Sequence, residues 1–130
     1  MATNDNTQVR RNAADPRQVK FHERKQRERR RKELEDLKLL IASEPGRRLV
    51  WRLLEQCATF ASVWDPSGSR MNYLAGRQDF GHFLMAELSE ADDEAIYRMM
   101  REAKARQKNE ELELAAFLTK SVRETDDGND

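Results

Sequence analysis

Residues with special covalent or conformational chemistry are scarce in this 130-residue chain, which has one cysteine, two histidines, three prolines and five glycines. The single cysteine, Cys57, excludes an intrachain disulfide and suits a reducing compartment. Neither a glycine-rich phosphate loop nor the spacing of a metal site is present. Met1 is followed by polar residues instead of an apolar signal core, and the longest nearly apolar stretch, residues 57–64, is too short to cross a bilayer. We therefore expect no cofactor, no metal ion, no secretion and no membrane span.

Catalytic groups are equally scarce. His22 lies in a run of basic residues, and His82 lies on a predicted core helix, where a histidine usually has a structural role. Cys57 is expected to be a small buried hydrophobic residue instead of a nucleophile. The acidic run of residues 87–94 does not have the spacing of a calcium loop. The sequence therefore predicts that the protein is not an enzyme and has no catalytic residue.

The two ends of the chain carry opposite charge, although the formal net charge is zero. Residues 10–32 contain eleven Lys or Arg against three acidic residues, and residues 87–130 contain thirteen acidic against seven basic residues. The segment 22–33 has no apolar residue, so it cannot bury a face in the chain's own core. It must be solvated or lie on an anionic partner. The candidate phosphate-binding or partner-binding residues are Arg24, Lys25, Arg27, Arg29, Arg30, Arg31 and Lys32.

Three uses of these bases stay open. Clustered bases bind DNA phosphates by releasing counterions. Only Phe21 stands beside them as a residue that can stack on a base, so sequence-specific reading is not indicated. Docking on an acidic protein surface and a solvated helix without a partner are the alternatives. Deletion of residues 1–32 is expected to leave the core nearly as stable, because this segment has few apolar side chains to bury.

Helical periodicity runs through the chain, and no segment shows the sustained alternation of a strand. Asp15 followed by Pro16 is typical of a helix N-terminus, and the helix that begins there is predicted to continue to Ser43. A Ser-Glu-Pro-Gly sequence then ends the pattern, and a second helix begins with Pro45 in its first turn. Apolar residues recur at helical spacing from there to Ala61.

A third helix is predicted over residues 71–88, and the sequence from Ser89 to Asp92 is a capping box that predicts the start of a fourth. The fourth helix passes into the charged run of residues 101–113. The predicted fold is all-α, a small helical hairpin or bundle with a long basic N-terminal arm and an acidic C-terminal tail. We expect a disordered tail at 1–14, the basic arm at 15–43 and the helical core at 44–104. A charged helix is expected at 105–123 and the acidic tail at 124–130.

The predicted core is small for a chain of this length. Leu53, Leu54, Phe83 and Leu84 are expected to be inaccessible to solvent, because they lie on the apolar faces of the second and third helices. Domains with so few core residues are marginal alone, which favours oligomerisation or docking on a partner.

Two Gly-Arg pairs stand near the starts of predicted helices. Glycine inside a packed helix costs about 1 kcal/mol relative to alanine, and it is tolerated where another helix approaches closely. Two interpretations of Arg77 and Asp79 stay open. They can pair with a neighbouring helix, for example Arg77 with Glu55 or Asp79 with Arg47, or they are ordinary surface charges. The structural signature defined by the two pairs is Gly46, Arg47, Gly76, Arg77 and Asp79.

Three segments of the chain carry a resemblance to a known family, namely Gly46–Cys57, Ala75–Met85 and Tyr97–Ala103. In these segments the chain resembles a family of small all-α tailed-phage proteins, encoded among the virion structural genes of podovirus-type phages. The resemblance covers residues 44–104 and leaves both ends unmatched. It implies a phage virion context, and it implies no activity for any residue.

Together, the residues and the resemblance predict a non-enzymatic virion structural or accessory protein, made in the host cytoplasm. We expect it in several copies, docked through its basic arm on the portal, the head–tail junction or the packaged DNA. The alternative is a phage-encoded DNA-binding or host-directed regulatory protein. A helix-turn-helix reader needs a polar recognition helix. The predicted helix 71–88 instead presents Phe80, Phe83 and Leu84, which argues against such a reader.

Overall fold

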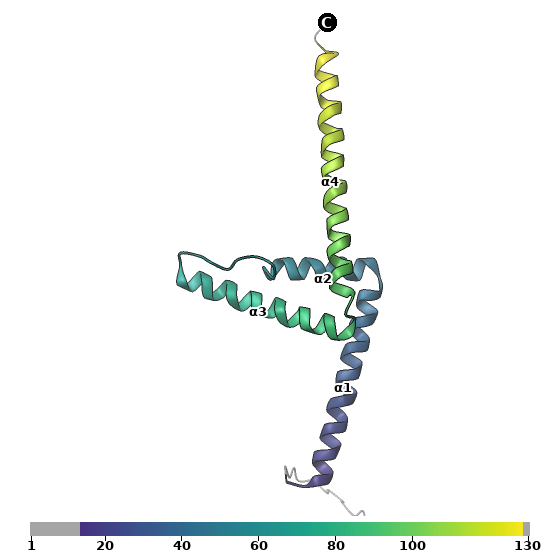
Figure 1. Ribbon diagram of the computed structural model, residues 1–130, viewed down its shortest axis with the longest axis vertical. Helices are drawn as coiled ribbons and strands as arrows, with labels where there is room; N and C mark the ends of the chain where they lie inside the picture. Colours follow the sequence, from purple (N-terminus) through teal and green to yellow (C-terminus); the bar gives the residue numbers. More distant parts are fainter. Residues whose placement is uncertain (1–13, 129–130) are drawn as a thin grey trace, which may run out of the picture.

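The structure is a computed structural model that describes residues 14–128. This part of the chain contains four helices and no strand, so the all-α prediction is confirmed (Figure 1). Residues 1–13 of the predicted disordered tail lie outside the described residues. The helices are α1 (Pro16–Ala42), α2 (Glu44–Gln56), α3 (Gly68–Ala91) and α4 (Ala95–Asp126).

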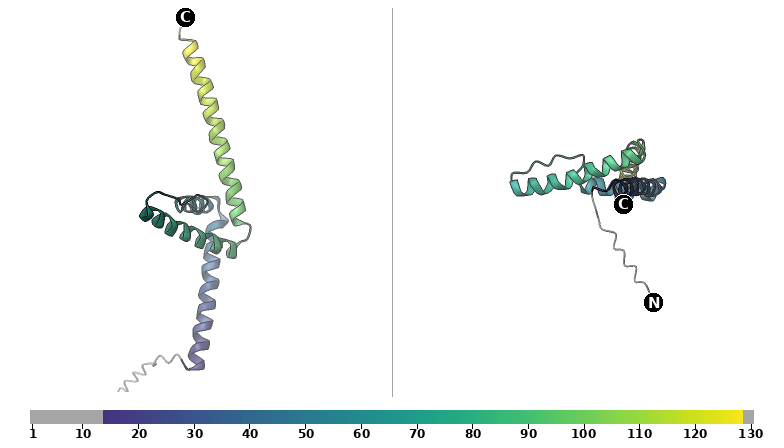
Figure 2. Two further views of the ribbon diagram at one scale, coloured as in Figure 1. Left: turned by 60° about the vertical axis from the view of Figure 1, so that its left-hand side comes forward. Right: turned by 90° about the horizontal axis from the view of Figure 1, so that it is seen from below.

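A central body carries two single-helix arms. The helices α2 and α3 lie side by side, and α1 and α4 extend from one end of this pair in opposite directions (Figures 1 and 2). We call residues 30–106 the body, residues 16–29 the N-terminal arm and residues 107–126 the C-terminal arm. Apart from Gln18 and Ser121, which are half-buried, every residue of the two arms is exposed.

The first two helices begin where the sequence predicts. The Asp15 carboxylate accepts a hydrogen bond from the backbone N–H of Arg17 at 2.9 Å, and proline occupies the first turn of α1. Ser43 ends α1 and caps α2, since its Oγ accepts from the N–H of Gly46 at 3.2 Å. The end of α2 differs from the prediction, because the helix stops at Gln56 and Ala58 adopts a left-handed backbone with φ of 51°.

The boundary between α3 and α4 also differs from the prediction. Ser89 does not cap a helix but lies inside α3, which continues to Ala91 because Leu88 and Ala91 are buried against the rest of the body. The turn is closed by Asp92, whose Oδ1 accepts from the N–H of Glu94 at 3.0 Å. The helix α4 then continues to Asp126, so the charged run and the first residues of the predicted acidic tail are helical.

The core lies where the end of α1, the middle of α2, the end of α3 and the start of α4 meet. Two predicted core residues are misplaced, because Leu53 is 45% exposed and Phe83 is 57% exposed. The next residue on each helix faces the core instead, since Leu54 is fully buried and Leu84 is half-buried. The buried cluster is Ile41, Val50, Leu54, Leu88, Ala95 and Met99.

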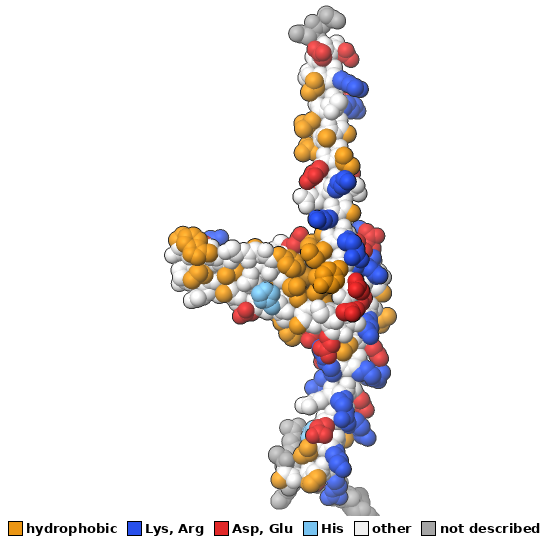
Figure 3. All heavy atoms as spheres, in the orientation of Figure 1, with side chains coloured by type: hydrophobic (Ala, Val, Ile, Leu, Met, Phe, Trp, Pro, Cys, Tyr) orange, Lys and Arg blue, Asp and Glu red, His pale blue; other side chains and the backbone are white. Residues whose placement is uncertain are grey.

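Apolar side chains remain on the surface of this small protein. Figure 3 shows them gathered over the junction of α4 with the body, at the far tip of the body and along the C-terminal arm. Trp64 at 74%, Phe117 at 66% and Val122 at 67% are among the most exposed of them. A body this small cannot cover all the large apolar side chains that the chain carries.

Candidate functional site: the helix junction, the basic stripe and the α4 groove

Arg47 ties three helices together at the junction. Its Nη1 donates to the last carbonyl oxygens of α1, those of Ile41 and Ala42, at 3.1 Å each. Its Nε donates to the carboxylate of Glu102 on α4 at 2.9 Å, and its Nη2 lies 2.9 Å from the same carboxylate. The hydrogen bond with Glu102 raises the pKa of Arg47 above its usual range, so the guanidinium stays charged. One side chain therefore satisfies a helix end and holds α4 against it.

Gly46 permits this arrangement. It is buried in the first turn of α2, where a Cβ atom would overlap the carbonyl oxygen of Leu40 and lie 2.9 Å from its carbonyl carbon. The close approach expected for this glycine is therefore confirmed. Gly46 and Arg47 form one structural unit, in which the glycine admits the end of α1 and the arginine binds it.

The second Gly-Arg pair is built differently. Gly76 lies inside α3, and no atom stands within 4 Å of the position of its Cβ, so neither a close approach nor a helix start explains it. The close approach on α3 occurs instead at Gly81. There a Cβ atom would overlap the Thr59 side chain and lie 2.9 Å from the Cβ of Cys57. The sequence reasoning missed Gly81, because glycine contacts across a loop leave no helical periodicity to read.

Arg77 repeats the role of Arg47 at the next helix end. It donates to the carbonyl oxygen of Gln56, the last residue of α2, and lies 5.8 Å over the ring of Tyr73. The expected pairing of Arg77 with Glu55 does not form. Asp79 is exposed and makes no ion pair with any residue of the described range, so its expected pairing with Arg47 does not form either.

One of the predicted anion-binding residues is held by the body itself. Arg30 is paired with two carboxylates of α3, with its Nη1 2.6 Å from Glu87 and its Nη2 bonded to Glu90. These hydrogen bonds raise the pKa of Arg30 well above its usual range. The segment 1–32 is therefore attached to α3 through Arg30. Because the Arg30 guanidinium already binds two carboxylates, it is not free to bind an external anion.

The other six predicted residues divide by their partners within α1. Lys25 pairs with Glu28 at 3.3 Å, and Arg31 pairs with Glu35 at 2.9 Å. These pairs are exposed, and exposed pairs of this kind contribute little to stability. The remaining four are exposed and make no ion pair with any residue in 14–128. They are Arg24, Arg27, Arg29 and Lys32.

A basic stripe runs along one face of α1, from the N-terminal arm to the first residues of the body. Steps of three and four residues place its members above one another on the helix, and 14 residues of helix span about 21 Å. Arg24 also lies 5.9 Å over the ring of Phe21. The sequence reasoning missed the first two members, because it followed the density of charge and not its helical spacing. The stripe consists of Arg17, Lys20, Arg24, Arg27 and Arg31.

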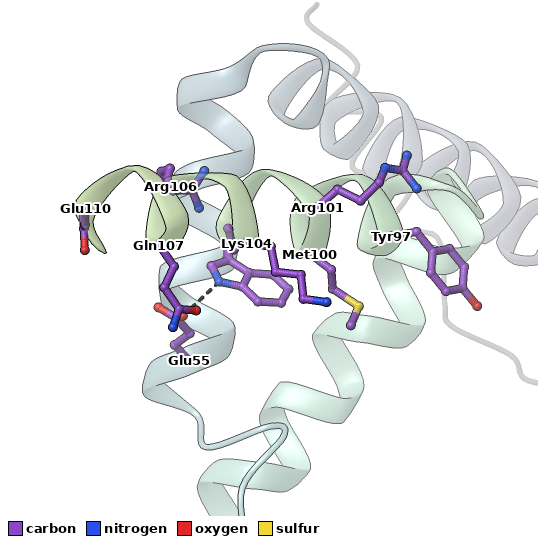
Figure 4. A pocket seen from close by; sticks show the side chains of 10 residues that line it. Glu55, Tyr97, Met100, Arg101, Lys104, Arg106, Gln107 and Glu110 are labelled. Carbon is purple, nitrogen blue, oxygen red and sulfur yellow. Dashed lines mark hydrogen bonds between the residues drawn. The ribbon is translucent and has the colours of Figure 1, made fainter. Parts of the chain in front are cut away.

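A groove of about 730 Å³ lies where α4 crosses α2 (Figure 4). Trp51 and Glu55 of α2 form one side, and the Trp51 Nε1 donates to the Glu55 carboxylate at 2.9 Å. On the α4 side, the Nη1 of Arg106 is buried and has no hydrogen-bond partner among the described residues. No sequence motif pointed to this groove. The α4 residues along it include Tyr97, Met100, Arg101, Lys104, Gln107 and Glu110.

The residues considered for catalysis are dispersed. His82 is exposed on α3, which corrects its expected core position, and Cys57 is half-buried at the end of α2. Among residues 14–128, no group of three His, Cys, Asp or Glu side chains is arranged to hold a metal ion. In the same part of the chain, no helix has the length and apolar character to cross a membrane.

The segment with the most internal contacts is also the one that comparison identifies. The profile of the Bbp19-like phage protein family matches residues 37–101, which include the core, Gly46, Arg47 and Gly81. The chain belongs to the Bbp19-like phage protein family. The phage origin expected from the sequence is thereby confirmed, and both arms lie outside the matched segment. No curated protein and no solved structure matches the chain.

Proposed function

We propose that this member of the Bbp19-like family is a non-enzymatic structural or accessory component of the phage virion. It is present in several copies and docks on the portal, the head–tail junction or the packaged DNA. The observation that carries this proposal is the contrast between a clamped body and two exposed helical arms. Single helices gain most of their stability from tertiary packing, so arms of this length are suited to contacts with another molecule.

The charge of the N-terminal arm indicates which kind of surface it docks on. Arg24 and Arg27 are unpaired members of the basic stripe, and the two acidic residues of the arm, Glu23 and Glu28, flank the stripe on either side. An anionic surface, either carboxylates of a virion protein or DNA phosphates, is the complementary partner. The alternative, a phage-encoded DNA-binding or host-directed regulatory protein, is favoured by the stripe alone and leaves the exposed C-terminal arm unexplained.

Quantitative mass spectrometry of purified particles tests the virion assignment. We expect the protein at a fixed number of copies per particle, relative to the portal protein. Absence from washed particles, with the protein present in the infected-cell lysate, would contradict the proposal and favour the regulatory alternative.

Paired charge deletions test whether the basic stripe is the docking face. Arg24→Gln with Arg27→Gln removes two unpaired charges from the stripe, and we expect incorporation into particles to fall. Arg29→Gln with Lys32→Gln is the matched control, because it removes two unpaired charges of α1 that lie outside the stripe. Equal loss in both variants would show that net charge, and not the stripe, governs incorporation.

The chemistry of the partner follows from conservative changes at the same two positions. If the stripe binds DNA, the log–log salt slope of binding should shrink by about 2 in the glutamine variant and stay unchanged with lysine. If it binds carboxylates in bidentate geometry, lysine should also reduce incorporation, because an ammonium group lacks the planar fork of arginine.

A further inference from the structure

One face of α4 continues without interruption from the groove into the C-terminal arm. Residues spaced alternately by three and four share this face, which is about 32 Å long over the 21 steps from Tyr97 to Leu118. Its two ends are apolar and exposed, with Tyr97 at 60% and Met100 at 44% in the groove, and Leu114 at 57% and Leu118 at 54% in the arm. The full set on this face is Tyr97, Met100, Lys104, Gln107, Glu111, Leu114 and Leu118.

The order of charges along α4 identifies what fits this face. Residues 98–108 carry five basic side chains and one acidic, Glu102, which Arg47 already binds. Residues 110–113 carry three glutamates and no base. A basic block followed by an acidic block is complementary to a second copy of the same helix in antiparallel orientation. A parallel arrangement would place like charges together.

An antiparallel pair centred near Gln107 matches both ends of the face. It brings the arm leucines of one copy beside Tyr97 and Met100 in the groove of the other, so apolar meets apolar. In the middle, Lys104 of each copy faces Glu111 of the other. Each contact occurs twice, as in any two-fold symmetric interface.

The groove has the features that such an arm requires. Trp51 offers a partly exposed aromatic surface and lines the groove together with Met100 and Lys104. The Arg106 Nη1, which is buried and has no partner among residues 14–128, obtains a carboxylate acceptor from the glutamates of the incoming arm. Figure 3 shows apolar side chains along the arm, several of them on the side from which the body projects.

We propose that two copies of this chain associate through α4 as an antiparallel pair, with the C-terminal arm of each copy lying in the α2–α4 groove of the other. This inference rests on the multi-copy part of the proposed function and names the surface through which the copies meet.

Sedimentation equilibrium of the purified full-length chain tests the pairing. We expect a dimer for the wild type. Replacing Leu114 and Leu118 by Gln should weaken dimerisation by roughly 100-fold, because four leucine side chains per dimer lose their apolar contacts. The matched control is Leu112→Gln, since Leu112 is 60% exposed and lies about 200° around the helix from Leu114. A monomeric wild type, or equal weakening by the control, would overturn the proposal.

Charge reversal tests the orientation independently of the leucines. Lys104→Glu and Glu111→Lys should each weaken dimerisation, because each places like charges opposite one another twice. Mixing the two variants should restore dimerisation. The Lys104→Glu variant carries Glu at both positions and the Glu111→Lys variant carries Lys at both, so every Glu of one copy faces a Lys of the other. Circular dichroism of each variant alone confirms that α4 remains helical. A mixture no tighter than its components would overturn the antiparallel arrangement.

These results are separable from those of the particle assay. A monomeric chain found in particles at fixed copy number contradicts the pairing and leaves the proposed function in place. A dimeric chain absent from particles contradicts the virion assignment and leaves the pairing in place.

Discussion

The body and the two arms are built from the same helices but are held in different ways. In the body, helix ends are bound by arginines that reach across from the next helix, as Arg47 does for α1 and Arg77 for α2. In the arms, the ion pairs lie within one helix, as between Lys120 and Glu124 at 3.9 Å. The family match covers residues 37–101, most of the body, and stops before both arms. The comparison shows that contacts between helices hold the body together, whereas each arm is stabilised by interactions within its own helix.

The largest expected effect contrasts two neighbouring leucines of the body. Leu54→Ala should lower the free energy of unfolding by about 2–5 kcal/mol, because Leu54 is fully buried and a cavity would remain. Leu53→Ala should cost about 1 kcal/mol or less, since this side chain already faces solvent. Urea unfolding followed by circular dichroism measures both. Similar losses would mean that the inward and outward faces of α2 are misassigned.

A second pair of variants contrasts two glycines with opposite expected signs. Gly46→Ala should destabilise by about 1–3 kcal/mol, because the new methyl group overlaps the end of α1 and the helices must separate. Gly76→Ala should stabilise by about 0.5–1 kcal/mol, since open space surrounds it within α3. Thermal unfolding decides the signs, and destabilisation by Gly76→Ala would reveal a contact at that position.

The smallest expected effect locates the boundary between the N-terminal arm and the body. Deleting residues 1–28 should leave the melting temperature nearly unchanged, because the described residues removed are almost all exposed. Deleting residues 1–32 should lower it further, since the pairs of Arg30 with Glu87 and Glu90 are lost. The matched full-length variant Arg30→Gln should reproduce that difference. Identical melting of both truncations would place Arg30 outside the body.

Local chemistry made part of this structure predictable. Asp15 with Pro16 and Ser43 with Pro45 are complete N-terminal signals, because capping needs only residues adjacent in sequence. The absence of strand alternation was sufficient for the all-α class. The basic segment was also identified correctly as exposed, apart from Arg30.

The remainder depends on contacts between segments distant in sequence. Leu53 and Leu54 both belong to an apolar pattern, and only the position of α4 and of the end of α1 decides which is buried. Gly81 and Arg77 meet the end of α2 across the intervening loop, so their roles have no local signature. The sequence indicated a charged helix at 105–123, and α4 continues beyond it to Asp126, into residues that were assigned to the acidic tail.

The Arg47 clamp has a mechanical consequence. Its guanidinium lies at the point where two long helices meet, since it binds the end of α1 on one side and Glu102 of α4 on the other. The distance from Glu102 to the C-terminal end of α4 is roughly 36 Å, so a tilt of α4 by about 5° at Glu102 moves that end by about 3 Å. A sub-ångström adjustment at one ion pair is thereby magnified into a displacement large enough to shift a side chain from one contact to the next.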